Sequence, residues 1–186
     1  RSRGLGDVYK RQQLLEVRPN DGHLGLAELE AHFNVTVVTQ NIDNLHERAG
    51  SRRIIHLHGE LTKVCSSRDP YNPHYIKELK PDEYEVKFGD KAGDGTQLRP
   101  FIVWFGEPVP EIETAVNYVE KADIFVIIGT SMNVYPAAGL LNYVPREAEV
   151  YLIDPKPVDV HSMRRIHVIQ KGASEGVREL RSLLQP

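Results

Sequence analysis

Apolar and polar positions along the chain follow the period of helices in some segments and of strands in others. Leucine and alanine recur at helical spacing over 23–33, and the segments 111–122 and 177–184 show a similar pattern. Short runs rich in β-branched residues between these segments predict strands. Two further short helices are expected at 45–49 and 137–143, and strands at 35–39, 54–57, 102–105, 124–128, 150–153 and 168–169.

Strands alternate with helices along the chain, and several of the strands are apolar throughout. Such strands are typical of parallel sheets that helices cover on both faces. We therefore predict an α/β fold built on a Rossmann-like, doubly wound parallel sheet. The segment 60–100 lacks a strong period and is rich in proline, glycine, tyrosine and charge, which predicts a small irregular subdomain.

The first residues of the chain, 1–12, carry no clear helix or strand period. We interpret them as a disordered segment or one that is not native to the domain, which leaves residues 13–186 as the domain itself. A flexible native tail explains the same composition equally well.

Charge and composition exclude several classes of function. The net charge is −3, so no general basic field for nucleic acid is expected. No apolar run approaches the roughly 18 residues of a membrane span, so we expect no membrane partner. Cys65 is the only cysteine, which excludes an internal disulfide and fits a reducing compartment. The default location is therefore cytoplasmic.

Small and polar residues stand directly after several predicted strands, where parallel sheets bind their ligands. Gly129, Thr130 and Ser131 follow the strand 124–128; a glycine lets a ligand approach the backbone, and hydroxyls bond to phosphate or ribose. Asp154 ends the strand 150–153 and can accept a hydrogen bond from a ribose diol. Taken alone, each feature is better explained by an ordinary turn.

A histidine stands at the end of the strand predicted at 54–57. His58 precedes Gly59, and an imidazole that is neutral near pH 7 suits a general base. His56 lies two residues earlier and points to the same face if the strand continues. The two histidines can alternatively form a metal pair, although no third ligand at a suitable spacing is evident.

Four short motifs occur in a fixed order along the chain. They are Thr39–His46 (TQNIDNLH), His58–Leu61 (HGEL), Val103–Glu107 (VWFGE) and Gly129–Ser131 (GTS). This series resembles the sirtuin family of NAD-dependent protein-lysine deacylases. The resemblance covers residues 13–186.

The resemblance implies both a reaction and a set of site residues. It implies NAD-dependent removal of acetyl groups from lysines of proteins or peptides, giving nicotinamide and O-acyl-ADP-ribose, and general similarity adds succinyl or malonyl groups. His58 matches the catalytic base, which takes a proton relayed through the ribose diol. The implied cofactor-binding residues are Gln40, Asn41, Ile42, Asp43, Gly129, Thr130, Ser131, Asp154, Pro155, Lys156 and Ala173. The implied substrate-binding residues are Val103, Phe105, Gly106, Glu107, Val134 and Tyr135.

Two departures from the family pattern bear on function. Sirtuins commonly hold a structural zinc with two C-x-x-C pairs, whereas here Cys65 is alone and Arg68 stands at the partner position. We therefore expect no zinc. The family also begins with a strand and a Gly-Ala-Gly loop, which are not found ahead of Gln13. We expect this first strand and loop to be missing and the activity of the chain to be impaired. The alternative function is a non-catalytic module that binds NAD or ADP-ribose.

Overall fold

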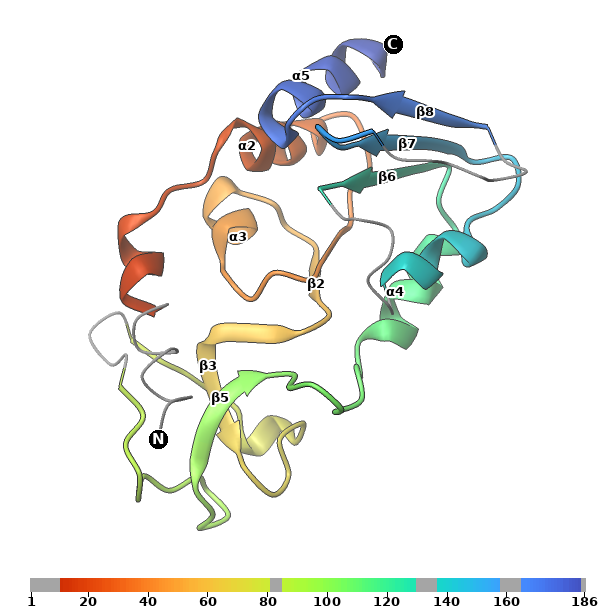
Figure 1. Ribbon diagram of the computed structural model, residues 1–186. Coiled ribbons are helices and arrows are strands. Elements are labelled where there is room, and N and C mark those ends of the chain that lie inside the picture. The colour runs from red at the N-terminus through yellow and green to blue at the C-terminus, as the bar shows by residue number, and fades with distance from the viewer. Residues whose placement is uncertain (1–10, 81–84, 130–136, 158–164, 185–186) are drawn as a thin grey trace. The chain divides into compact units, whose positions relative to one another are not determined.

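The computed structural model describes residues 11–80, 85–129, 137–157 and 165–184, and it divides into two compact units (Figure 1). The first unit consists of Arg1–Arg18, Thr39–Asn44 and His56–Pro108. The second consists of Pro19–Val38, Leu45–Ile55 and Val109–Pro186. The subdomain expected at 60–100 falls within the first unit.

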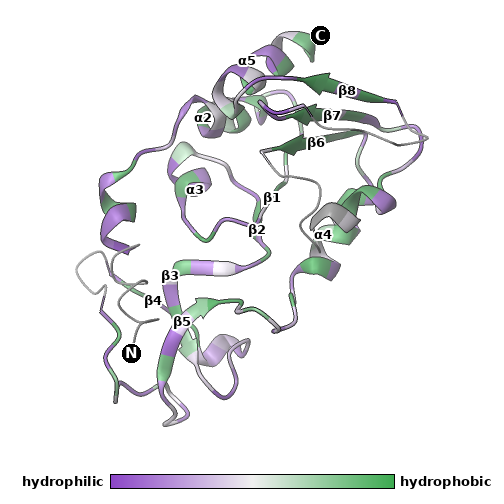
Figure 2. Ribbon diagram, viewed as in Figure 1, coloured by the Kyte–Doolittle hydropathy of each residue, from purple (hydrophilic) through white to green (hydrophobic). Residues whose placement is uncertain are grey.

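The second unit contains a parallel sheet of three strands in the order β6-β7-β8. The register pairs Ile128 with Ile153 and Ile153 with Ile169, so the three strands end at one edge. Their residues are hydrophobic along most of their length (Figure 2), as expected of strands that are covered by other elements. The bounds are β6 (Ile124–Ile128), β7 (Glu149–Ile153) and β8 (Ile166–Ile169).

Two helices of the second unit pack closely because glycines face their partners. A Cβ on Gly25 of α2 (Asp21–Leu29) would lie 2.7 Å from a methyl carbon of Val177 in α5 (Ala173–Leu183). A Cβ on Gly176 of α5 would lie 2.2 Å from a methyl carbon of Ile153. This close approach buries Leu29, Tyr151, Ile153, Ile169, Val177 and Leu180 in one core. The remaining helices are α3 (Leu45–Ala49), α4 (Ile112–Val119) and the 3-10 helix η2 (Ala137–Tyr143).

The first unit contains an antiparallel sheet of three strands in the order β4-β3-β5. The central strand has a bulge between Glu60 and Val64, where its pairing with β5 shifts register. Residues 11–16 form a helix in the same unit, and Arg11 donates from Nε to the carbonyl of Leu61 at 2.8 Å. The bounds are β3 (Gly59–Ser66), β4 (Lys77–Glu78), β5 (Leu98–Ile102) and the 3-10 helix η1 (Pro73–Tyr75).

A separate ribbon of two strands joins β1 (Val37–Thr39) and β2 (Ile54–His56). The amide of Val37 donates to Arg53, and the amide of Leu57 donates to Thr39, both at 2.9 Å. The two bonds advance in the same direction along both segments, as in parallel strands.

Most predicted elements lie within a few residues of their expected positions, and three expectations need correction. The strand expected at 102–105 lies at Leu98–Ile102 and pairs antiparallel with Gly59–Ser66, and the chain after it turns at Gly106, whose φ is +87°. The segment expected to be irregular contains the eight-residue strand β3, whose bulge breaks the alternation that a sequence pattern needs. The predicted α/β fold with a parallel sheet is confirmed by β6, β7 and β8, and the described strands are grouped into three sheets in all.

The third correction concerns α5, which begins at Ala173 rather than at residue 177. Gly176, which precedes the expected helix, lies inside α5 where this helix meets Ile153. The boundary expected at residue 12 falls inside the helix 11–16, and the origin of residues 1–10, which lie outside the described part, stays a prediction. Among the described helices, none has the length and apolar character that a membrane crossing requires.

Candidate active site

The loop after β1 is tied to the chain around β2 and β3 by backbone groups. The hydroxyl of Thr39 accepts from the amide of Asn41 at 3.0 Å, which holds the start of the loop. The carbonyl of Ile42 accepts from the amide of Leu61 at 2.7 Å. The predicted cofactor residues Gln40, Asn41, Ile42 and Asp43 therefore lie in a loop that is fixed at both ends.

His58 follows β2 and makes one hydrogen bond that determines its tautomer. Its Nδ1 lies 3.2 Å from the carbonyl oxygen of Gln40. A carbonyl can only accept, so Nδ1 of this imidazole carries the hydrogen, and in the neutral ring Nε2 has a lone pair. The half-buried side chain is thus oriented by the backbone and can accept a proton at Nε2.

His56, two residues before His58, also contacts a backbone carbonyl of the loop after β1. Its Nδ1 lies 3.2 Å from the carbonyl oxygen of Asn41. The two histidines therefore contact successive carbonyls of the same loop. His56 was considered only as half of a metal pair, and its backbone partner could not be found without knowing that the loop lies beside β2.

The VWFGE segment begins beside His58. The amide of Val103 donates to the carbonyl of His58 at 2.9 Å. The chain then turns, with Glu107 N donating to Trp104 O at 3.0 Å and with Gly106 in the left-handed region at a φ of +87°. Phe105 is fully exposed at the tip of this turn. The first unit thus brings the predicted base and the predicted substrate segment together.

The predicted cofactor residues of the second unit stand at the edge where β6, β7 and β8 end. Gly129 has a φ of +60°, and a Cβ added there would meet nothing within 4 Å, so a ligand can approach its backbone. Asp154 follows β7, and its Oδ1 accepts from the amide of Lys156 at 2.8 Å. Ala173 opens α5, whose cap residue Gly172 offers no side-chain acceptor to the first amides. This edge fits the phosphate and ribose groups of a dinucleotide.

The structure adds little about six of the predicted site residues. Pro155 and Lys156 are exposed beside Asp154. Four others lie outside the described residues. These are Thr130, Ser131, Val134 and Tyr135.

Comparison with known proteins identifies the group to which these features belong. A model of the Sir2 family matches residues 5–136, which include the loop after β1, His58 and the VWFGE turn. The chain belongs to the Sir2 family, the sirtuins.

Individual sirtuins match almost the whole chain. An NAD-dependent protein deacylase of Bacteroides thetaiotaomicron is 83% identical over 177 residues, which are 95% of this chain and 76% of that protein. A crystal structure of a Sir2 homolog–NAD complex matches with 32% identity and a TM-score of 0.78, covering 96% of this chain and 71% of the other. A structure of Sir2 with a p53 peptide and NAD⁺ matches with 27% identity and a TM-score of 0.73, covering 92% and 72%.

The position where the sirtuin pattern expects the first zinc-binding pair does not fit a metal. Cys65 is fully buried, its Sγ donates to the carbonyl of Pro100 at 3.8 Å, and burial raises the pKa of its thiol. Zinc binds the thiolate, which burial disfavours. Arg68, three residues on, is a cation and offers no ligand atom.

A cluster of hydrogen bonds between side chains lies at this position instead. The fully buried hydroxyl of Ser66 contacts the carboxylate of Asp94 at 2.7 Å and the hydroxyl of Thr96 at 2.9 Å. Thr96 also contacts Asp94 at 2.7 Å. Ser66 accepts from the amides of Arg68 and Asp69, at 3.1 and 3.0 Å. This cluster, which we call the Ser66–Asp94–Thr96 cluster, joins the end of β3 to the turn before β5.

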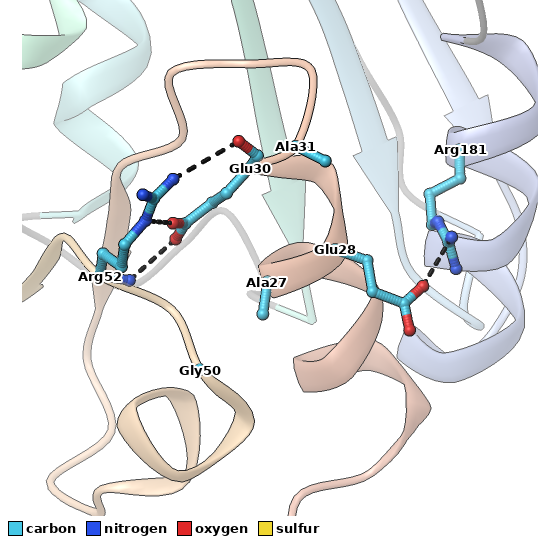
Figure 3. A pocket seen from close by; sticks show the side chains of 7 residues that line it. All are labelled: Ala27, Glu28, Glu30, Ala31, Gly50, Arg52 and Arg181. Atoms are coloured by element: carbon cyan, nitrogen blue, oxygen red, sulfur yellow. Dashed lines mark hydrogen bonds and ion pairs between the residues drawn. The ribbon is translucent and has the colours of Figure 1, made fainter.

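A surface hollow in the second unit contains none of the predicted site residues (Figure 3). Its charged groups are paired with one another: Arg52 with Glu30, and Arg181 with Glu28. The contact with Arg52 lowers the pKa of Glu30. We interpret these two ion pairs as contacts that hold α2 beside α5 and beside the start of β2. The lining residues of the hollow are Ala27, Glu28, Glu30, Ala31, Gly50, Arg52 and Arg181.

Proposed function

We propose that this sirtuin is an NAD-dependent protein-lysine deacylase in which His58 is the general base. The observation that carries the proposal is the hydrogen bond from His58 Nδ1 to the carbonyl of Gln40, which leaves Nε2 able to accept a proton. The relative from Bacteroides thetaiotaomicron, named an NAD-dependent protein deacylase, supports the same reaction.

Two sets of residues are proposed to bind the cofactor, as the family resemblance implies. Gln40, Asn41, Ile42 and Asp43 are proposed to bind the nicotinamide and its ribose. When bound, NAD supplies the ribose carbon to which the acyl oxygen of the substrate is transferred as nicotinamide leaves. The residues proposed for the adenosine and phosphate groups are Gly129, Thr130, Ser131, Asp154, Pro155, Lys156 and Ala173.

The substrate is proposed to be an acylated lysine in a protein or peptide. The solved Sir2 structure with a p53 peptide supports this class of substrate. Phe105 and Gly106 form the exposed turn beside His58 and are the described residues best placed to contact a peptide. Preference for acetyl, succinyl or malonyl groups and a cytoplasmic location stay predictions.

One experiment separates the proposed enzyme from a module that only binds NAD or ADP-ribose. The purified protein is titrated with each ligand by calorimetry and then incubated with NAD and an acetyl-lysine peptide. A deacylase releases nicotinamide and free lysine peptide in equal amounts. A binding module gives the calorimetric signal with an unchanged peptide.

We also propose that the protein holds no structural zinc, with the Ser66–Asp94–Thr96 cluster in its place. We expect metal analysis of the purified protein to find far less than one zinc per chain, and a chelator to leave its melting temperature unchanged. One tightly bound zinc per chain, together with a fall in melting temperature on chelation, would contradict this proposal.

The cluster predicts a dependence of stability on pH. Hydrogen bonds, first from Ser66, lower the pKa of Asp94 from 3.8 to about 2, and its side chain is only 3% exposed. Because the pKa is lower in the folded state, the charged form stabilises the fold above pH 3.8, and this contribution is lost as pH falls through about 2. We expect Asp94→Asn to lower the melting temperature clearly near neutral pH and progressively less between these two values.

A matched control for this prediction is Glu85→Gln, which removes an exposed carboxylate paired with Lys87 at 3.7 Å. Exposed pairs contribute little to stability, so this variant should follow the unchanged protein at every pH. If the gap between Asp94→Asn and the unchanged protein stays constant down to pH 2, Asp94 does not act as a charged group.

A further inference from the structure

The family resemblance assigns Glu107 to the wall of the acyl-lysine cleft. In the structure, its carboxylate interacts with other residues of the same unit. Its Oε1 lies 3.0 Å from Nη1 of Arg99, and its Oε2 lies 3.2 Å from Nη2, so the two groups form a paired contact. Oε2 also accepts from the amide of Trp104 at 3.0 Å. The carboxylate therefore closes the turn from inside, while Phe105 remains exposed.

The position of Arg99 is fixed by strand β5, in which it lies. It lies in β5 opposite Cys65 of β3 in the antiparallel register, and its side chain is 16% exposed. The same β5 continues into Val103, whose amide bonds to the carbonyl of His58. A rigid strand thus carries Arg99 at one end and leads into the proposed substrate turn at the other.

We propose that Arg99 and Glu107 are a positioning pair that fixes the Trp104–Glu107 turn, so that Phe105 and Gly106 meet the peptide substrate beside His58. The inference rests on the proposed deacylase function. Glu107 acts through the turn and not as a group that touches the substrate. An error of about 1 Å in such a segment can cost roughly a hundredfold in rate, so the pair matters although it makes no contact with reacting atoms.

The variants that test the pair are Arg99→Gln, Glu107→Gln and the double variant. Glutamine at 107 retains an oxygen that can accept from the amide of Trp104, so this change removes the charge pairing alone. Lys63→Gln is the control, because Lys63 pairs with Glu60 at 2.6 Å in the same unit without touching the turn. All variants are compared with the unsubstituted protein, at temperatures where each is folded by circular dichroism.

We expect kcat/KM for the acyl-peptide to fall by up to roughly a hundredfold in each single variant, mainly through a higher KM, as a displaced turn would require. The double variant should be no worse than the singles, because they remove the same interaction. The KM for NAD should stay within twofold, and Arg99→Lys should recover part of the loss. An unchanged peptide KM in both single variants, or an equal loss in the KM for NAD, would overturn the proposal.

A measurement that does not depend on catalysis tests the positioning pair independently of the proposed function. Trp104 is the only tryptophan in the sequence, so its fluorescence reports on the turn alone. Acrylamide quenching should increase in Arg99→Gln and Glu107→Gln and stay unchanged in Lys63→Gln. Unaltered quenching in both variants would refute the positioning role. An unchanged protein that quenches as expected but deacylates no peptide would refute the proposed function instead.

Discussion

Replacement of His58 by alanine is expected to lower kcat for NAD-dependent deacylation by roughly 10²- to 10⁴-fold, the range for loss of a general base. The imidazole is oriented by the carbonyl of Gln40 and has Nε2 available for the proton. Removing it leaves the loop and the turn beside it in place. The KM for NAD should therefore change much less than kcat, as measured by initial rates with an acetyl-lysine peptide in the intact protein.

The control for this prediction is His74→Ala. His74 lies exposed in the 3-10 helix η1 of the same unit, where its amide donates to the side chain of Asn72. It should retain full turnover. Equal activity of His58→Ala and the unchanged protein would show that another group accepts the proton.

Replacement of Gly59 by alanine is expected to destabilise the protein by about 2–5 kcal/mol, the sum of left-handed backbone strain and overpacking. Gly59 has a φ of +78°, and a Cβ there would lie 2.2 Å from the carbonyl oxygen of Phe101. That oxygen belongs to the backbone of β5 and cannot move aside without disturbing the pairing of β3 with β5. Unfolding in urea measures the change.

Gly95→Ala separates the two causes, because Gly95 has the same φ of +78° and nothing within 4 Å of an added Cβ. It should cost only the backbone strain, about 1–2 kcal/mol. If both variants lose the same stability, the close approach of Phe101 contributes nothing and this account of the strand after His58 is wrong.

The local period of the sequence predicted the second unit well. The apolar run Ile124–Ile128 and the short helix Leu45–Ala49 lie where the pattern placed them, because burial or a simple turn decides each of them locally. The strand β3 escaped prediction because its bulge interrupts the alternation and its partner β5 lies more than thirty residues away along the chain. Pairing between distant segments leaves no trace in a local window.

The residues of the candidate site likewise fall into those that the sequence indicated and those that only the fold reveals. Motif order indicated His58 and the VWFGE turn, and the structure places both in contact through Val103. No sequence signal distinguishes Arg99 or Ser66 from other polar residues, since each owes its role to a partner brought near by β3 and β5. Glu107 belongs to the VWFGE motif, but its contact with Arg99 can be seen only in the folded structure.

The most direct test of the central claim is to follow all products when the intact protein is given NAD and an acetyl-lysine peptide. The account predicts that nicotinamide, deacetylated peptide and O-acetyl-ADP-ribose appear in equal amounts by mass spectrometry, and that deacetylated peptide and O-acetyl-ADP-ribose form at least about a hundredfold more slowly with His58→Ala. Deacetylation without NAD, or consumption of NAD without deacetylation, would contradict it.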